Sequence, residues 1–142
     1  MTGITQAESA KWIARYYELC GAKDIDGAME YWALEGELRF ANEEPLIGRE
    51  AIRSTFQGFV DMWEKETHTL LNLWELPDGI VIFELGIAFR MHDGTELGVE
   101  GAAVNRVEGQ RFLAQRTYVD MGPVWAAAQA AQQAAAGAAA QG

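Results

Sequence analysis

The sequence predicts an α+β domain, cone-shaped, with three N-terminal helices packed on a strongly curved antiparallel sheet. From Val81 to Val119, most odd-numbered residues are apolar or small, and the charges fall mainly on even-numbered ones. A period of two is typical of strands with one face against a core and the other against water. In residues 7–63 the apolar side chains instead recur at helical spacing. A curved sheet closed by helices on one side encloses a pocket, so the fold class predicts a small-molecule site.

Three helices are predicted from apolar stripes and from the residues that bound them. The first covers residues 7–20 and ends before Gly21, a residue type favoured after helix ends. The second is capped by Asp24 and continues to Trp32, and the third covers residues 48–63. The inward stripes of the first and third helices are Trp12, Ile13, Tyr16, Leu19, Cys20, Ile52, Phe56, Phe59 and Trp63.

Five strands are predicted around these helices. A short strand over residues 37–41 precedes the third helix, and four longer strands follow it. Each of the three turns between the longer strands ends in Gly, at positions 79, 94 and 109, which suits three-residue loops with the glycine in the left-handed region. The longer strands are expected at about residues 67–75, 80–91, 95–106 and 111–120.

These turns also predict which residues face each other in the last two hairpins. The predicted pairs are Ile87–Val99, Leu85–Gly101, Val99–Thr117 and Gly101–Gln115. The same register places two pairs of opposite charge on the even-numbered face, Arg90 with Glu96 and Glu100 with Arg116.

Composition excludes several classes of function. The net charge of −10 argues against binding to nucleic acid or to anionic membranes. No segment is apolar for the length of a membrane span, and no basic start with an apolar run opens the chain, so a cytoplasmic protein is expected. One cysteine, Cys20, excludes an internal disulfide, and the scattered His and Cys predict neither a metal site nor a cofactor.

The domain is expected to occupy residues 1–125, followed by a tail over residues 126–142. The tail is almost entirely Ala and Gln, without charge or an amphipathic stripe. Alanine favours helix, so we expect a helical or frayed segment without chemistry, whose removal leaves the fold intact.

Several segments resemble the nuclear transport factor 2-like superfamily, over about residues 7–125. Residues 14–19, followed by residues 24–26, look like the opening of the ketosteroid isomerases, and residues 47–52 look like the family's entry to its third helix. Residues 68–72 are similar to a segment of the SnoaL-like branch, which includes scytalone dehydratase-type enzymes, and residues 116–120 to the last-strand signature. The resemblance implies the cone fold. It does not fix a reaction, because this fold carries isomerases, hydrolases, cyclases, dehydratases and binders.

The usual catalytic carboxylates of these relatives are missing. Ketosteroid isomerases use a carboxylate base and a protonated Asp in the oxyanion hole, and the matching positions are Phe40 and Ala103. Limonene epoxide hydrolases use an Asp-Arg-Asp set, and the matching positions are Leu85, Ile87 and Thr117. Both of these reactions are therefore disfavoured.

Tyr16 and His68 are the candidate catalytic residues. Tyr16 matches the oxyanion tyrosine of the isomerases and could donate to a developing enolate, or it is a core tyrosine bonded to the backbone. His68 is the one general base by residue type, with an ordinary pKa near neutrality. The family resemblance turns His68 toward the pocket, whereas the turn at residues 77–79 places Leu71 and Leu73 inside and His68 outside. A bulge would reconcile the two.

The pocket is expected to hold a hydrophobic, ring-containing molecule with one or two oxygen functions. The predicted ligand-binding residues are Trp12, Trp32, Phe40, Phe56, Phe83, Leu85, Ile87, Val99, Gln115 and Thr117, and Asn105 is a further polar residue of the same face. Charged and polar residues of even number, Glu84, Glu100, Arg116, Tyr118 and Asp120, are expected on the outer face, which is flat enough for a two-fold homodimer.

Three functions stay open for a SnoaL-like pocket protein of this kind. The first is an isomerase, cyclase or dehydratase that moves a proton on an oxygenated ring compound. The second is a non-catalytic binder of a hydrophobic small molecule, and the third is a dimeric interaction module. The fold alone does not separate them.

Overall fold

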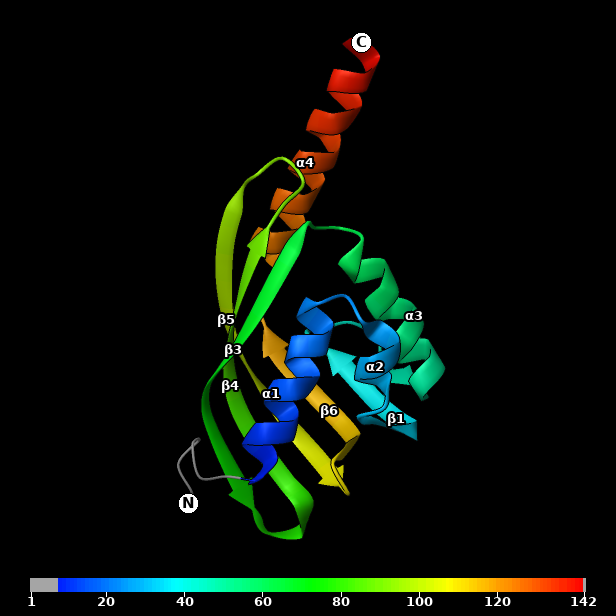
Figure 1. The fold of residues 1–142 in the computed structure, drawn as a ribbon, viewed down its shortest axis with the longest axis vertical. Helices are drawn as coiled ribbons and strands as arrows, with labels where there is room; N and C mark the ends of the chain where they lie inside the picture. Colours follow the sequence, from blue (N-terminus) through cyan, green and yellow to red (C-terminus); the bar gives the residue numbers. More distant parts are fainter. Residues whose placement is uncertain (1–7, 142) are drawn as a thin grey trace.

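The computed structural model describes residues 8–141 as a six-stranded, strongly bent sheet with helices packed on one face (Figure 1). The sheet order is β2-β1-β6-β5-β4-β3, and every neighbouring pair is antiparallel except β1 and β6. The helices are α1 (Glu8–Gly21), α2 (Ile25–Met29), α3 (Arg49–Val60) and α4 (Gly122–Gln141). The strands are β1 (Trp32–Phe40), β2 (Leu46–Ile47), β3 (Lys65–Leu76), β4 (Ile80–Arg90), β5 (Glu96–Glu108) and β6 (Arg111–Val119). The predicted α+β cone is confirmed.

The first hairpin register predicted from the turns is also confirmed. Ile87 lies opposite Val99 and Leu85 opposite Gly101. Every odd-numbered residue of β4 from Val81 to Phe89 is buried, and Arg90 forms an ion pair with Glu96 at 3.3 Å on the other face. Strand β4 thus carries its apolar side chains toward α1, as its period of two predicts.

The second hairpin differs from its predicted register. Thr117 lies opposite Ala103 and Gln115 opposite Asn105, so both predicted partners, Val99 and Gly101, are wrong. The turn has two residues rather than three, because Gly109 and Gln110 both adopt positive φ (55° and 59°), the conformation of a tight hairpin turn. The shorter turn shifts the pairing by three residues, and a bulge in β6 between the partners of Val107 and Arg106 adds a fourth. Since four is an even number, each side chain keeps its predicted face.

The slip also removes the predicted contact between Glu100 and Arg116, because Arg116 lies opposite Val104. The guanidinium of Arg116 instead lies over the ring of Tyr118, 4.6 Å from its centroid. Glu84, Glu100, Tyr118 and Asp120 are exposed.

Strand β3 contains the bulge that decides the orientation of His68. His68 lies opposite Ile87 and Leu70 opposite Leu85, but Asn72 lies opposite Glu84, so Leu71 is an extra residue in the ladder. Leu71 is accordingly 40% exposed while Leu73 is 1% exposed. A bulge changes the parity of the strand on its two sides, so His68 and Leu73 both face inward.

The boundaries of the N-terminal elements differ from the prediction. Helix α2 ends at Met29 instead of Trp32, and β1 begins at Trp32 instead of residue 37. The cause is long-range pairing, since Trp32 pairs with Phe112 of β6. A bulge follows at Gly36, where a side chain would clash with the Trp32 ring at 2.8 Å.

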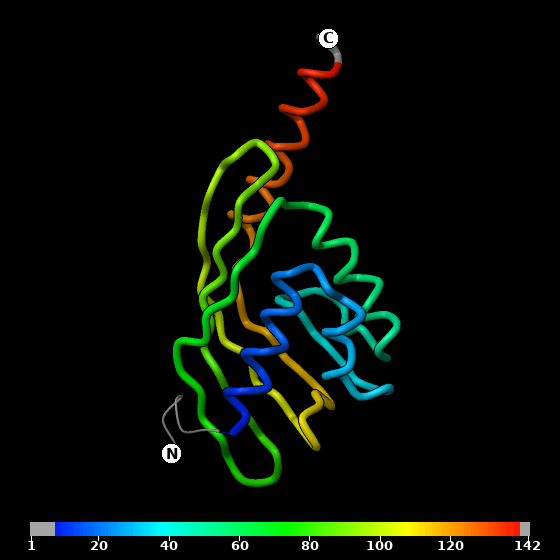
Figure 2. Tube along the Cα trace, in the orientation of Figure 1, coloured from blue at the N-terminus to red at the C-terminus, as the bar shows by residue number. Residues whose placement is uncertain are grey.

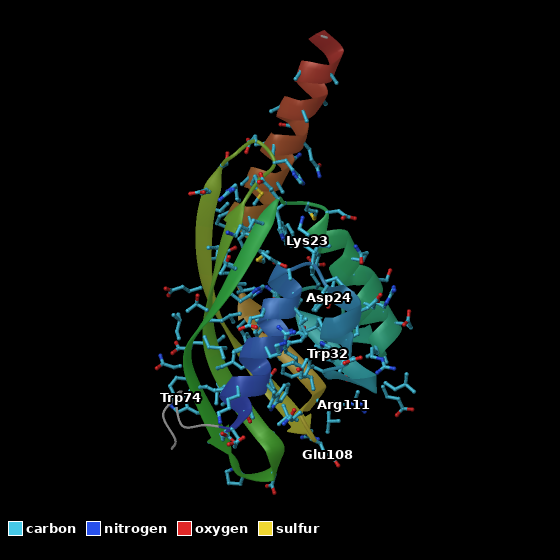
Figure 3. All side chains as sticks on the ribbon, in the orientation of Figure 1. Lys23, Asp24, Trp32, Trp74, Glu108 and Arg111 are labelled. Atoms are coloured by element: carbon cyan, nitrogen blue, oxygen red, sulfur yellow. The ribbon has the colours of Figure 1, made fainter. Side chains whose placement is uncertain are left out.

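An aromatic cluster fills the end of the cone near the start of α1. Trp12 stacks on Tyr31 at 5.9 Å and packs on Phe112 at 4.9 Å, and Trp32 packs on Phe112 at 5.1 Å. Figure 3 shows Trp32 in the interior, with Lys23 and Asp24 nearer the opposite end of α1. This end of the cone is solid core, which leaves space only toward the end of α1 that carries Cys20.

Helix α4 begins inside the predicted domain and then leaves it (Figure 2). Val124, Ala128 and Ala131 are buried, and the Trp125 ring lies 5.5 Å from Phe59 and 6.1 Å from Trp63. Residues 132–139 are exposed. Within residues 8–141, no helix is apolar enough over a sufficient length to cross a membrane.

We predict different effects of two truncations of α4. Ending the chain after Gln133 should leave the melting temperature unchanged, because residues 134–139, the removed residues whose burial the structure describes, are all exposed. Ending it after Met121 should lower the free energy of unfolding by about 3 kcal/mol or more, since the buried surface of Val124 and the packing of Trp125 are lost. Thermal denaturation followed by circular dichroism measures both, and equal melting temperatures for the two truncated chains would contradict the prediction.

Candidate functional site

A pocket lies between α1, α3 and the inner face of the sheet, beyond the aromatic cluster. Its volume is about 70 Å³, enough for one small ring or a few water molecules, since one water needs about 10–15 Å³ on the same kind of measure. The lining residues are Tyr16, Tyr17, Cys20, Ile25, Phe40, Phe56, Phe59, Val60, Trp63, Glu66, His68, Leu85, Ile87, Phe89, Gln115, Thr117 and Met121.

The structure brings together most of the residues that the sequence suggested for this site. Those in the lining are Tyr16, His68, Phe40, Phe56, Leu85, Ile87, Gln115 and Thr117. Residues from six elements, α1, β1, α3, β3, β4 and β6, therefore converge on one pocket.

Four residues predicted to bind the ligand lie outside this lining. Trp12 and Trp32 belong to the aromatic cluster at the other end of the cone. Phe83 is fully buried beneath the Tyr17 ring, 5.8 Å away. Val99 is only half-buried, because the slip of the second hairpin leaves it beyond the end of β6, where Gly101 already pairs with Val119.

Glu66 and His68 form the titratable wall of the pocket. They are two residues apart on β3 and so point to the same face, opposite Phe89 and Ile87 of β4. The His68 ring stacks on Tyr17 with centroids 4.5 Å apart. Its Nδ1 is buried, and none of the described residues forms a hydrogen bond with it.

Burial moves the pKa values of these two groups in opposite directions. It raises the pKa of the Glu66 carboxyl to about 7, against the weaker opposing effect of the Lys23 charge. It lowers the pKa of the His68 imidazole to about 4. At neutral pH, therefore, His68 is uncharged and Glu66 is divided between its acid and its carboxylate.

A second unpartnered group lies on the same wall. Trp63 is 2% exposed, and its indole lies close enough to the Glu66 carboxyl to lower the pKa of that group, but among the described residues none accepts a hydrogen bond of ordinary geometry from its Nε1. Lys23 donates to the Trp63 backbone oxygen at 2.9 Å and so fixes the segment that leads into β3. Buried polar atoms normally have a partner, so Trp63 and His68 mark where a bound molecule could place polar atoms.

The tyrosines of α1 provide hydroxyl groups in the pocket. Trp32 Nε1 donates to the Tyr16 hydroxyl at 3.1 Å, which orients that group. Burial, followed by the influence of Cys20, raises the pKa of Tyr16 well above its ordinary value. Tyr16 is thus a buried core residue whose hydrogen-bond partner is an indole rather than the backbone, and it also lines the pocket.

A chain of amides forms the opposite wall. Asn105 Nδ2 donates to the Val81 oxygen at 2.9 Å, Gln115 Nε2 donates to Asn105 Oδ1 at 2.7 Å, and Thr117 Oγ1 donates to Gln115 Oε1 at 3.3 Å. All three side chains are buried.

Glu66 is the functional candidate that the sequence reasoning missed. It has the same parity as His68 on β3, so an inward His68 implies an inward Glu66. Five lining residues, Cys20, Ile25, Phe59, Trp63 and Phe89, are recognisable from the sequence as inward apolar side chains but not as pocket residues, while Tyr17, Val60 and Met121 had no separate signal.

Two further predictions concern regions outside the pocket. In the part of the chain that the structure describes, His, Cys, Asp and Glu do not gather in a group of three that could hold a metal ion. Val104 and Tyr118 are 40% and 54% exposed on the outer face of the sheet. A homodimer through that face stays a prediction.

Comparison with solved structures places the fold among known ones. A nuclear transport factor 2-like protein of unknown function from Exiguobacterium sp. 255-15 is 15% identical, with a TM-score of 0.66 over 77% of this chain and 98% of the other. A protein of ketosteroid isomerase-like fold from Catenulispora acidiphila, solved with trimethylamine, is 17% identical, with a TM-score of 0.68 over 75% of this chain and 83% of the other. Bal32a, from a soil-derived mobile gene cassette, is 20% identical, with a TM-score of 0.67 over 78% and 88%. At these identities the likeness shows the fold alone.

The sequence comparisons identify the family. No curated protein matches the chain significantly. The model of the SnoaL-like domain matches residues 13–115, from within α1 through β5 to the first part of β6. The chain therefore belongs to the SnoaL-like family.

Proposed function

We propose that this pocket is the active site of an isomerase, cyclase or dehydratase that moves a proton on a small, apolar, oxygenated ring compound. The observation that carries the proposal is a buried carboxyl beside a buried, uncharged imidazole in one aromatic-lined hollow. Carboxyl groups that act as acid or base near neutral pH have pKa values raised in this way.

In the proposed mechanism Glu66 is the base. Its carboxylate takes a proton from a carbon next to the oxygen function of the ligand, and electron density moves onto that oxygen. The Tyr16 hydroxyl, held by Trp32, donates a hydrogen bond to the oxygen as its charge develops. The protonated Glu66 then gives this proton to the free ring nitrogen of the uncharged His68, which releases the proton of its other ring nitrogen to the new position or to a leaving hydroxyl, so that both groups return to their starting charge.

Proton transfer can be tested without the natural ligand. Wild-type protein in D₂O should accelerate exchange of the protons next to the carbonyl of cyclohexanone, measured by ¹H NMR. In Glu66→Gln the accelerated exchange rate should be about 10²- to 10⁴-fold lower than in wild type, which is the usual contribution of a general base. Tyr16→Phe should lose about 10²-fold, because one hydrogen bond to the developing charge is removed.

The matched control is Glu75→Gln, the same change at an exposed position of the same strand. It should exchange at the wild-type rate. Equal rates in wild type and Glu66→Gln would contradict the role assigned to Glu66.

The two shifted pKa values also predict how stability depends on pH. The free energy of unfolding should fall as pH rises from 4.5 toward 7, because Glu66 ionises more readily in the unfolded chain than in the folded protein. It should also fall as pH drops from 6.5 toward 4, because His68 takes up a proton more readily in the unfolded chain. These opposite slopes overlap, so Glu66→Gln should leave stability rising with pH over that range, and His68→Phe should leave it falling. Each effect should reach about 3 kcal/mol, measured by urea denaturation at several pH values, and parallel pH profiles for the two variants would contradict the assignment.

A second candidate function, binding of a small amine, is supported by the same lining. The pocket combines several aromatic rings with one carboxyl that has no cation within ion-pair distance among the described residues, and aromatic cages with a carboxylate suit alkylammonium ions. The related fold from Catenulispora acidiphila was solved in complex with trimethylamine.

The amine candidate predicts a distinct pH dependence. Binding of trimethylammonium, measured by calorimetry, should tighten about tenfold as pH rises from 6 to 8, since Glu66 becomes a carboxylate. Neutral tert-butanol, of similar shape, should show no such change. Loss of trimethylammonium binding in Glu66→Gln would support this candidate, and unchanged binding would reject it.

A further inference from the structure

We propose that Asn105, which lies behind the pocket wall, fixes the orientation of Gln115 so that the pocket selects a ligand carrying a hydroxyl group. The inference rests on the proposed small-molecule site and names the functional group that this site recognises. Asn105 is a positioning residue, since it is 1% exposed and is absent from the lining.

The backbone determines which way the Asn105 amide points. Its Nδ2 lies 2.9 Å from the Val81 oxygen and 3.3 Å from the Ala103 oxygen. Backbone carbonyls only accept hydrogen bonds, so the nitrogen of the amide must face them. The Oδ1 atom then faces Gln115.

The orientation of the Gln115 side-chain amide is fixed by its hydrogen bond with Asn105. Its Nε2 must donate to Asn105 Oδ1, and the distance is 2.7 Å. Burial raises the pKa of the Tyr17 hydroxyl, and the nearby Gln115 amide lowers it, which is the effect of an N–H directed at the hydroxyl oxygen; we assign the second N–H to this direction. Only the Oε1 atom remains for a ligand, and it already accepts one hydrogen bond, from Thr117 at 3.3 Å.

The wall therefore offers a ligand two acceptors and one donor. The acceptors are Gln115 Oε1 and the lone pairs of Thr117, and the donor is the Tyr17 O–H, whose oxygen faces a Gln115 N–H. A ligand hydroxyl can donate to the acceptors and accept from Tyr17 at once. An ether or ketone oxygen can only accept.

Because the wall is buried, the difference between a hydroxyl and an ether or ketone oxygen should change the affinity for the ligand. Gln115 is 6% exposed and Thr117 is 5% exposed, so a ligand that fails to meet them leaves polar groups without water. Sites built to hydrogen-bond a hydroxyl discriminate strongly against analogues that lack it. Because the space fits one small ring, the group expected is a hydroxyl on a single ring.

Three single-ring probes test the inference, namely phenol, anisole and toluene, with binding measured by ligand-observed NMR and calorimetry. Wild-type protein should bind phenol about tenfold or more tightly than either of the others. Gln115→Leu should reduce that preference to near unity. In Asn105→Leu the Gln115 amide is free to turn an N–H into the pocket. The affinity for anisole should therefore rise relative to the affinity for phenol. A general loosening of the fold would not produce this change.

Asn72→Leu is the matched control, because Asn72 is exposed on the outer side of β3, and it should keep the wild-type preference. If Asn105→Leu fails to fold, the wild-type comparison together with Gln115→Leu and Thr117→Val decides the question. Equal binding of phenol and anisole to wild type, or an unchanged preference in Gln115→Leu, would overturn the inference. Binding of none of the probes would overturn the small-molecule site with it, whereas phenol selection without proton exchange would support the inference and reject only the enzyme.

Discussion

The burial of one face of β4 is the constraint on which the rest of the structure depends. Its odd-numbered residues are buried, with Phe83 packed on Tyr17 of α1 and Phe89 on Trp63, and its partners β3 and β5 must align with it on either side. A slip by one residue would send the apolar side chains to water and the charges to the core, at a cost of several buried side chains of about 1.5–3 kcal/mol each. Strand β4 therefore holds a single register, and the neighbouring strands adjust to it through bulges.

The chemistry of the pocket follows from loss of water rather than from close charge pairs. Burial is the largest influence on both Glu66 and His68, and it favours the uncharged form of each. Burial raises the pKa of a carboxyl and lowers the pKa of an imidazole, because it disfavours the charged form of each group. The environment of the pocket thus gives the Glu66 carboxyl a pKa near neutrality and keeps the His68 imidazole uncharged there.

For a physical reason, the fold could be predicted correctly from the sequence, and two thirds of the predicted site residues lie in the pocket lining. Apolar periodicity is a local property that survives errors in register, so the inward face of β4 and the stripes of α1 and α3 could be read directly. The register between β5 and β6 was predicted wrongly because Gln110 adopts a left-handed conformation, which is not expected of a glutamine. The length of β1 depends on its pairing with β6, a contact between residues about 80 positions apart, which no local pattern encodes.

The orientation of His68 shows the limit of that reasoning most clearly. Two signals conflicted, and the extra residue Leu71 that resolves them is an ordinary leucine in an apolar run. Glu66 was overlooked for the same reason, since its inward position depends on the same bulge. The exposure of Leu71 is a consequence of the pairing of β3 with β4, so it can be recognised only once the strands are paired.

That extra leucine has an evolutionary meaning. Gain or loss of one codon in the middle of β3 would exchange the residues that face the cavity for those that face solvent along half the strand, while the hairpin at residues 77–79 stayed in place. Proteins built on this cone can therefore replace their reactive groups by a change of length as well as by substitution. Comparing relatives position by position, without allowing for such a shift, would then align a reactive side chain with one that faces outward.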